Sequence, residues 1–489
     1  MDIRLPEEVK NIIDTLQKAG FQAYAVGGCV RDAILGRKPQ DWDITTSAKP
    51  EDVKSLFKRT VDTGIKHGTV TVMMNHEGFE VTTYRIDGEY EDCRHPKEVT
   101  FTTQLSEDLL RRDFTINAMA YNEKEGVVDL FGGREDLEKG LIRCVGEATE
   151  RFDEDALRIL RAFRFAAQLG FEIDEKTFEA AKEKAPNLAK VSAERIRTEL
   201  NKILLSNGPD RLFAAQEAGV TKVVLPEFDR ILAGGADARG LQGVKSGKAM
   251  SGMRAVKAVS LVGSIATDPN NAFDEKDLLT LKWAALLSEY TDTGLFKADA
   301  KDFTEVRGKD EPGERYEAVA TSEMADAEES MKHDKVREIM TRLKFDNETR
   351  DKVVRLVDFH RQKLIIVNDV AVRGFMKKIG PSLCPLLFEL QTAEMLADGF
   401  VNTDGDNTVR VAKNLPKLNK AKEAYRIISE RGDCVSVGQL AVTGNDLIEA
   451  GFEKGPEIGK MLDFLLDKVL VDQSLNQKQK LLDLACLNY

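Results

Sequence analysis

Long apolar runs, paired cysteines and clustered histidines are all missing from this sequence of 489 residues. No segment approaches 18 uninterrupted apolar residues, which excludes a candidate membrane-spanning helix. The first residues are charged and amphipathic, and they have no apolar core of the kind that a signal peptide carries. The six cysteines include no CxxC pair and the five histidines are scattered, so the sequence supports no zinc site, disulfide framework or histidine-ligated metal. We therefore expect a reduced, cytoplasmic protein with no membrane partner.

The composition is that of an ordinary globular protein, and its order along the chain predicts the fold class. Charged residues make up 31% of the chain and hydrophobic residues 42%. The formal net charge of −12 excludes a uniformly basic nucleic-acid binder but leaves room for a local basic surface. Short strand-like and helical segments alternate up to about residue 145, and helical periodicity dominates afterwards. We predict an α+β head with a mostly antiparallel or mixed sheet, then a long helical body with a Gly-rich linker at 232–252 and a loop at 291–330.

The first group of candidate functional residues is GGCVRDAILGRKPQDWD at 27–43. Two glycines after a short strand let the backbone approach a bulky ligand, and the start of the following helix suits a phosphate. Arg31 adds a cation with forked geometry in the first turn. Asp41 and Asp43 are one residue apart on a predicted strand, so a period of two places both carboxylates on one face. Such a pair suits Mg²⁺, which prefers hard oxygen ligands.

The motif GGxxRDxxLGxxxxDxD, followed by RRDFTINA and EDALRILRAFRFAAQLGF, resembles the bacterial class II tRNA nucleotidyltransferases. These are the CCA-adding enzymes, and bacterial poly(A) polymerases are their close relatives. The close match covers about residues 21–220, and weaker similarity continues to the C-terminus. The resemblance implies a polymerase-β-like catalytic head at 1–145, a nucleotide-selecting helical neck at 146–230, a degenerate HD-like body at 231–360 and a tRNA-binding tail at 361–489.

The resemblance also implies an activity and its site residues. The enzyme would add C, C and A to tRNA with a missing or incomplete 3′-CCA, using CTP and ATP and releasing pyrophosphate. Asp41 and Asp43 would bind the catalytic Mg²⁺, and Gly28 and Arg31 would hold the nucleoside triphosphate. Glu80, on a nearby predicted strand, is a candidate for a third carboxylate. No protein partner is expected.

The second group is RRDFTIN, which begins at Arg111 in a segment that is predicted to be helical up to Tyr121. Both arginines can meet phosphates, and the resemblance makes Arg112 the direct nucleotide contact. Asp113 could accept a hydrogen bond from a ribose hydroxyl, which would favour ribonucleotides. On the predicted helix, Asn117 would share a face with Asp113.

The third group, EDALRILRAFRF, lies in a segment that is predicted to form one helix over 153–171. Asp155 and Arg158 would share a helix face, and Arg161 and Arg164 would continue the stripe in steps of three. Cytosine and adenine both present an amine donor beside a ring-nitrogen acceptor, whereas uracil and guanine present the reverse. An aspartate acceptor beside an arginine donor therefore matches C and A, with about 1–3 kcal/mol of discrimination for a good bidentate pair. The resemblance assigns this role to Asp155 and Arg158.

Two further segments extend the resemblance within the first half of the chain. The polar loop at 87–101 corresponds to a flexible loop that supports the change from C addition to A addition, and it carries His95 where an arginine is usual. The segment 192–200 resembles the neck helix that supports the nucleotide pocket. There we expect Glu194 and Arg197 to act as structural supports.

The middle and the C-terminal segments carry weaker signals. Leu-Leu-Ser-Glu at 286–289 stands where an HD hydrolase would carry a His-Asp pair. His333 and His360 alone do not make a complete ligand set, so we expect a degenerate HD fold kept for packing or RNA contact. Candidate RNA contacts are the basic stretches 373–378 and 413–426 and the glycine-containing segment 443–466.

Three alternatives stay open at this point. A bacterial poly(A) polymerase shares the catalytic motifs, although we do not find the basic motif after the neck that is typical of those enzymes. An enzyme that stops after CC is a second alternative. A catalytically silent tRNA-binding protein is the third, and the intact Asp41/Asp43 and Asp155/Arg158 pairs argue against it.

Overall fold

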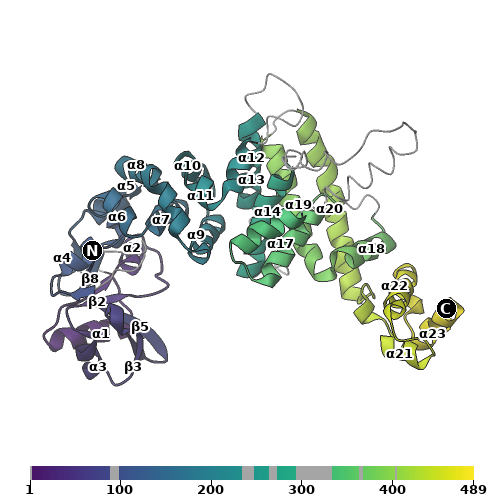
Figure 1. Ribbon diagram of the computed structural model, residues 1–489, viewed down its shortest axis with the longest axis horizontal. Coiled ribbons are helices and arrows are strands. Elements are labelled where there is room, and N and C mark those ends of the chain that lie inside the picture. Colours follow the sequence, from purple (N-terminus) through teal and green to yellow (C-terminus); the bar gives the residue numbers. More distant parts are fainter. Residues whose placement is uncertain are drawn as a thin grey trace, which may run out of the picture. The chain divides into compact units, whose positions relative to one another are not determined.

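A computed structural model describes the chain over residues 3–88, 99–233, 247–263, 273–292, 333–362, 367–401 and 405–488. The chain divides into two compact units, Met1–Asp229 and Arg230–Tyr489. Figure 1 labels many of the helices and several of the strands, numbered in chain order. Among the helices that the structure describes, none is long and apolar enough to cross a lipid bilayer.

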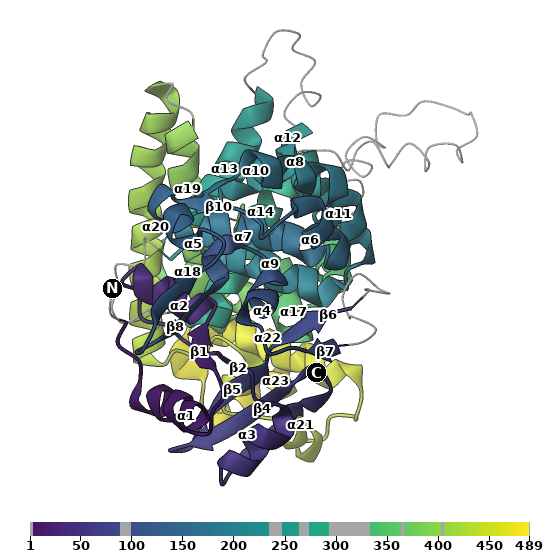
Figure 2. The same cartoon turned by 90° about the vertical axis from the view of Figure 1, so that its left-hand side faces the viewer.

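The first unit is built on a mixed seven-stranded sheet in the order β3-β4-β5-β2-β1-β8-β9 (Figure 2). The strands are β1 Ala23–Val26, β2 Ile44–Thr46, β3 Thr60–Gly64, β4 Thr69–Met74, β5 Glu77–Thr83, β8 Met119–Asn122 and β9 Gly126–Asp129. Strands β2 and β5 pair in parallel, and the other neighbours are antiparallel. Two shorter pairs join β6 Arg85–Asp87 to β7 Val99–Phe101 and β10 Leu141–Ile142 to β11 Glu172–Ile173. The expected α+β class with a mixed sheet is confirmed.

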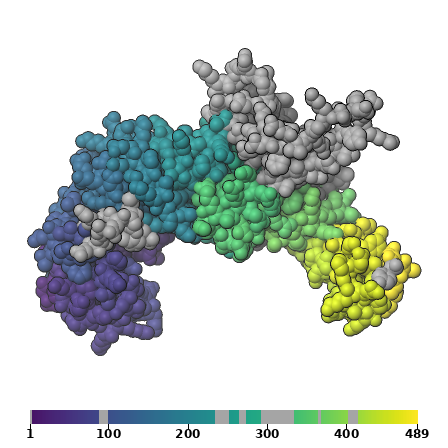
Figure 3. Space-filling view, in the orientation of Figure 1, coloured from purple at the N-terminus to yellow at the C-terminus, as the bar shows by residue number. Residues whose placement is uncertain are grey.

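Helices cover the sheet and then continue as a helical segment of the same unit. The helices of the head are α1 Glu7–Lys18, α2 Gly28–Ile34, α3 Pro50–Leu56, α4 Leu105–Leu110 and α5 Gly133–Lys139. Those that follow are α6 Ala148–Glu154, α7 Leu157–Leu169, α8 Glu175–Lys184, α9 Ala193–Leu205, α10 Arg211–Glu217, α11 Val220–Val224 and α12 Pro226–Ala233. Helix α1 packs against β1 and β2, and α7 packs against α9 and α10. In the space-filling view, the residues of the head are purple and blue (Figure 3).

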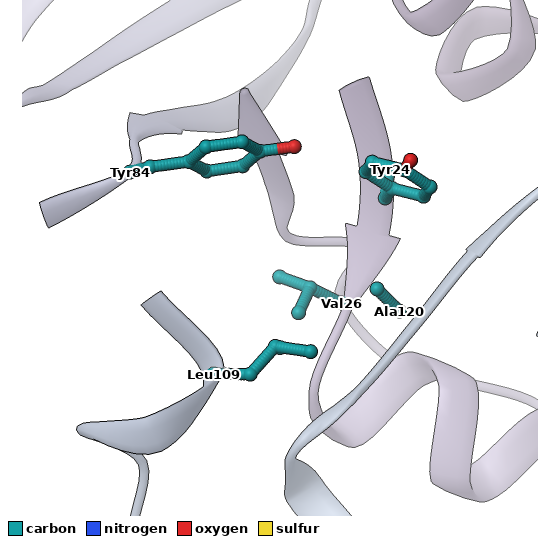
Figure 4. Packing of buried hydrophobic residues seen from close by; sticks show 5 residues of the cluster. All are labelled: Tyr24, Val26, Tyr84, Leu109 and Ala120. Carbon is teal, nitrogen blue, oxygen red and sulfur yellow. The ribbon is translucent and has the colours of Figure 1, made fainter. Parts of the chain in front are cut away.

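A hydrophobic cluster joins β1 to the segments that carry the candidate site (Figure 4). Tyr24 and Val26 of β1 pack with Ala120 of β8, with Tyr84 after β5 and with Leu109 of α4. Val26 immediately precedes the glycine pair, and Leu109 lies two residues before the arginine pair. Because burial of these side chains holds β1, β8 and α4 together, it also brings the glycine pair close to the arginine pair.

Two of the helices predicted from the sequence, at 111–121 and at 153–171, do not form as single helices in the structure. The segment 111–121 forms a 3₁₀ turn, Thr115–Asn117, and then enters β8, because pairing of β8 with β1 and β9 outweighs local helical preference. The segment 153–171 is split between α6 and α7. The split lies at Asp155, whose backbone is extended (φ −140°, ψ 101°) and whose carboxylate accepts the backbone N–H of Leu157 at 3.0 Å, a local bond that competes with a continuous helix.

The second unit is helical throughout its described ranges. Its named helices are α13 Gly247–Leu261, α14 Glu275–Asp292, α17 Asn347–Phe359, α18 Asp369–Ile379, α19 Cys384–Val401, α20 Gly405–Arg431, α21 Gly444–Glu449, α22 Pro456–Val471 and α23 Lys478–Leu487. Helix α13 packs against α14 and α19. Most of the expected linker at 232–252 and of the expected loop at 291–330 lies outside the described residues.

Polar side chains of the second unit are used largely for its internal packing. Buried Ser288 donates a hydrogen bond to Glu394 at 2.6 Å, and buried Glu289 forms an ion pair with Arg254 at 2.6 Å. Arg373, in the basic stretch 373–378 that we expected to contact RNA, is buried in an ion pair with Asp433 at 2.7 Å and does not present its charge to solvent. That part of the expectation is corrected.

Candidate active site

The first unit contains a cavity of about 250 Å³ whose lining combines residues from two of the three sequence groups. Its lining side chains are Arg111, Arg112, Asp113, Asp155, Leu157, Arg158, Arg161 and Arg195. Five arginines face two aspartates there, a net formal charge of +3 in a chain whose total is −12. A concave site of this sign suits an anionic ligand that also carries hydrogen-bonding groups.

Asp155 and Arg158 both line this cavity, but they do not lie on one helix. Asp155 follows α6, and its backbone carbonyl accepts the N–H of Arg158 at 2.9 Å. The Asp155 carboxylate accepts a hydrogen bond from Arg195 of α9 at 2.7 Å, across 40 residues of sequence. The Arg158 guanidinium donates to Glu154 at 2.5 Å and to the carbonyl of Arg111 at 2.9 Å. These bonds hold an acceptor and a donor at the cavity wall in defined orientations.

Asp113 is the centre of a hydrogen-bond network that extends to α2. Arg161 binds one oxygen of Asp113 through Nε and Nη2 at 2.8 and 2.6 Å, and Asn117 donates to the other at 3.1 Å. The side-chain oxygen Oδ1 of Asn117 in turn accepts a hydrogen bond from Arg31 at 2.7 Å. Although burial alone would raise the pKa of Asp113, the Arg161 charge and the hydrogen bonds from Asn117 and Arg161 hold it far below its ordinary value. Asp113 is therefore ionised, and it connects the RRD segment to both α2 and α7.

Asp108 of α4 lies beneath the two arginines and is fully buried. One carboxylate oxygen accepts two hydrogen bonds from Arg111 at 3.0 and 2.8 Å. The other accepts from Thr45 of β2 at 3.0 Å and lies 3.7 Å from Arg112. Burial alone would raise the pKa of Asp108, but the charges of Arg111 and Arg112 lower it below its ordinary value. One buried charge thus ties the arginine pair to the strand that follows Asp43.

The two glycines that precede α2 have different structural roles. Gly27 has φ +85° and ψ −132°, a conformation that side chains disfavour, and a Cβ atom there would lie 2.9 Å from Nη1 of Arg112. The missing side chain therefore makes room for the Arg112 guanidinium. Gly28 is the first residue of α2, and a Cβ atom there would meet Arg31 only at an ordinary 3.7 Å.

Asp41 and Asp43 lie immediately before β2, and both are exposed. Partial removal from water raises the pKa of Asp43, the charge of Arg112 opposes this, and the negative charge of Asp41 adds to it. Two neighbouring carboxylates of this kind fit a hard divalent cation, whose charge would relieve their mutual repulsion. Asp43 is close enough to Arg112, which lines the cavity, for their charges to interact.

Glu80 is not gathered with the two aspartates. It is exposed on β5, where the next residue, Val81, pairs with Ile44 of β2. In the described ranges, no three acidic, histidine or cysteine side chains form a group that could hold a metal ion. The role of Glu80 as a third carboxylate stays a prediction.

Arg164 is not among the residues that line this cavity, and its role in nucleotide binding stays a prediction. Each step of three residues turns a helix by about −60°, and six residues therefore carry Arg164 about 120° away from Arg158. Arg164 is instead buried in an ion pair with Glu199 of α9 at 2.7 Å. The supports that the structure shows on α9 are Arg195 and Glu199, whereas the expected Glu194 is exposed.

Sequence reasoning missed Asp108, Arg195 and Glu199. A charged residue within an apolar helix face is a usable signal, and Glu199 fits it because Ile196, Leu200 and Ile203 around it are buried. Asp108 is similarly next to buried Leu109. The partners of these charges, however, lie tens of residues away in the sequence and follow from the fold alone.

Three family models match separate parts of the chain. The poly A polymerase head domain matches residues 23–143, and the model described as "Probable RNA and SrmB- binding site of polymerase A" matches 170–232. A model described as tRNA nucleotidyltransferase domain 2 matches 407–485. The CCA-adding enzyme of Lactiplantibacillus plantarum is 50% identical over 237 residues, which are 48% of this chain and 56% of that enzyme. The CCA-adding enzyme of Leuconostoc mesenteroides is 54% identical over 207 residues, 42% of this chain and 52% of that enzyme.

A solved structure extends the similarity over nearly the whole chain. The Bacillus stearothermophilus CCA-adding enzyme in complex with CTP is 28% identical, with a TM-score of 0.66 over 99% of this chain and 97% of that chain. Over most of its length, this chain is therefore similar to the class II tRNA nucleotidyltransferase and poly(A) polymerase family. The Thermotoga maritima CCA-adding enzyme complexed with tRNA shares the fold, with a TM-score of 0.54 at 19% identity.

The agreement with the family is strongest in the first unit. The aligned sequence spans about half the length of the curated relatives, 56% and 52%. Of the loop at 87–101, which we expect to support the change from C to A addition, residues 89–98 lie outside the described residues, and they include His95. The four-domain division with boundaries after 145, 230 and 360 stays a prediction.

Proposed function

We propose that this protein is a CCA-adding enzyme. It would add C, C and A without a template to tRNA that lacks or has an incomplete 3′-CCA, taking CTP and ATP and releasing pyrophosphate. The observation that carries the proposal is the cavity in which Asp155 and Arg158 are each fixed by other side chains beside the arginines of the RRD segment.

Base selection follows from the chemistry of the Asp155–Arg158 wall. A carboxylate accepts from the exocyclic amine of cytosine or adenine, and a guanidinium donates to the neighbouring ring nitrogen. Uracil and guanine would bring a carbonyl to the carboxylate and an N–H to the guanidinium, and both contacts would be repulsive. Arg195 and the Arg111 carbonyl hold the two selecting groups in place, so the same wall can serve both CTP and ATP.

The remaining residues position the triphosphate and the ribose. Arg112, packed against Gly27 and next to Asp43, is placed to contact phosphate oxygens, and Arg31 lies on the neighbouring helix. Asp113 is an ionised acceptor on the cavity wall, as a ribose hydroxyl requires. Catalysis by this chain's own groups is then mainly orientation and stabilisation of charge.

We propose that Asp41 and Asp43 hold Mg²⁺. When bound, this ion would supply Lewis-acid stabilisation of phosphoryl oxygens. Ionised carboxylates are needed for that role, and their exposure beside the cavity suits it. Glu80 is the further carboxylate to test.

The deciding experiment uses a tRNA transcript without its CCA end, incubated with the protein, Mg²⁺, CTP and ATP. Sequencing of the 3′ ends should show products that stop at CCA, and Asp41→Ala should abolish them. Long A tails would indicate a poly(A) polymerase, and ends that stop at CC would indicate a CC-adding enzyme. Unchanged ends with tRNA still bound would favour the silent binding protein.

Base selection is tested with Asp155→Asn and a matched control. An amide can donate as well as accept, so we expect Asp155→Asn to lower the preference for CTP over UTP by about tenfold, near 1.4 kcal/mol. Asp153→Asn removes a nearby exposed carboxylate that binds Lys184 instead and should leave the preference unchanged. Equal preferences in both variants would contradict the role of Asp155.

A further inference from the structure

Phe165 lies behind the candidate site on α7. Its side chain is almost completely buried, and it is not among the residues that line the cavity. The ring packs edge-on against Phe114 of the RRD segment, with centroids 5.7 Å apart and an interplanar angle of 80°. Phe165 thus joins the neck helix α7, of which it is part, to the RRD segment of the head.

Three guanidinium groups gather around this one ring. The central carbon of Arg164 lies 3.6 Å from the ring centroid, that of Arg31 5.1 Å and that of Arg161 5.4 Å. All three are within the distance of about 6 Å at which a cation is attracted to the face of an aromatic ring. Arg31 comes from α2 and the other two from α7, so the ring contacts cations from the head and from the neck.

Each of the three arginines is also bound elsewhere in the site. Arg31 donates to Asn117, Arg161 binds Asp113, and Arg164 forms the buried ion pair with Glu199. Three like charges so close together repel one another. Burial lowers the pKa of Arg164, and the charges of Arg161 and Arg31 lower it further. The electron-rich face of the Phe165 ring can attract these guanidinium groups and so offset part of their mutual repulsion.

We propose that Phe165 is a positioning residue for nucleotide binding, whose ring holds Arg31 and Arg161 in the orientations that the site needs. This inference rests on the proposed function, because it assigns Arg31 and the Arg161–Asp113 pair to the nucleoside triphosphate. Phe165 acts through these arginines and does not touch the substrate. Its contribution is electrostatic, which distinguishes it from an ordinary core phenylalanine.

The chain offers a matched control two residues away. Phe163 is also fully buried on α7, and its ring packs edge-on against Phe178 with centroids 6.2 Å apart. Among the described cation contacts, none is to Phe163. Phe163→Leu and Phe165→Leu therefore remove the same ring from the same helix at similar burial, and they should destabilise the protein to a similar degree by urea unfolding.

The two variants should differ in their binding of Mg²⁺-CTP, which is measured by calorimetry on the full chain without tRNA. We expect Phe165→Leu to raise the Kd for CTP between about twofold and thirtyfold, the range that cation–π contacts support, and Phe163→Leu to leave it unchanged. Replacement of Phe165 by progressively fluorinated phenylalanines keeps the shape of the ring but weakens its negative face. The Kd should rise step by step along that series.

Two results would overturn the inference. One is an equal Kd for the wild type and Phe165→Leu, and the other is a flat response to fluorination, which also decides the matter if Phe165→Leu fails to fold. Failure of the proposed function looks different, because the wild-type chain itself would then bind no CTP and extend no tRNA. In that case the assignment of Arg31 and Arg161 to nucleotide binding would be wrong together with the proposed function.

Discussion

Alanine substitutions at Gly27 and at Gly28 can show whether the Arg112 guanidinium packs closely against Gly27. Gly27→Ala places a methyl group 2.9 Å from Nη1 of Arg112, closer than real Cβ contacts, on a residue with φ +85°. Gly28→Ala places the same methyl group at the start of α2, where the nearest contact is an ordinary 3.7 Å from Arg31. The same chemical change is therefore harmful at one position and harmless to packing at the next.

The expected energies follow from the two local geometries. The backbone conformation of Gly27 costs an alanine about 1–3 kcal/mol, and displacement of Arg112 from its place near Asp108 adds about 1 kcal/mol. We expect Gly27→Ala to destabilise the first unit by about 2–4 kcal/mol. Gly28→Ala should instead be neutral or stabilising by up to about 1 kcal/mol, since alanine is the better helix former.

Tryptophan fluorescence during urea unfolding can measure this difference in the full chain. The protein has two tryptophans, Trp42 in the first unit and Trp283 in the second, so a Trp283→Phe background reports on the first unit. Gly27→Ala should also weaken CTP binding, as it moves Arg112. Equal unfolding midpoints for the Gly27 and Gly28 variants would refute the close packing of Arg112 against Gly27.

Three further predictions concern the buried charges. Asp108→Asn should cost about 3–5 kcal/mol in the urea unfolding free energy of the same reporter protein, because Arg111 and Arg112 lose a buried counter-charge. The pKa of Asp108 is lowered in the folded state, so its stabilising contribution is present above its ordinary pKa of 3.8 and is lost as the pH falls through the lower folded value. The difference between wild type and Asp108→Asn should therefore shrink in acid. Arg195→Ala should release Asp155 and lower the kcat/KM preference for CTP over UTP severalfold, measured by primer extension on tRNA.

Each of these predictions has an outcome that would contradict it. Thr45→Val removes one hydrogen bond from Asp108 and should cost only about 1 kcal/mol, so a loss as large as that of Asp108→Asn would point to packing in place of charge. A difference that stays constant between pH 7 and pH 3 would exclude a titrating Asp108. Unchanged selectivity in Arg195→Ala would show that the Asp155 carboxylate keeps its orientation without that partner.

The sequence identified most of the chemistry because that chemistry is local. The order of strand, glycine pair, helix and Asp41/Asp43 follows from spacing over fewer than 20 residues, and the α+β head followed by helices follows from periodicity. Asp113 and Asn117 are paired as expected although the predicted helix is wrong, because the turn that ends at Asn117 also brings the two side chains within hydrogen-bond distance. The motifs alone were thus enough to indicate the family.

The tertiary structure decided how these motifs are held together. The helix expected at 111–121 became a turn and a strand because β8 completes a sheet with partners distant in the sequence, which local propensity does not record. Asp155 depends on Arg195, and Asp113 depends on Arg161, at separations of 40 and 48 residues. Such pairs are set by which helix faces are buried against each other. A one-dimensional pattern shows which residues can carry charge, but burial in the folded chain determines which opposite charges must meet.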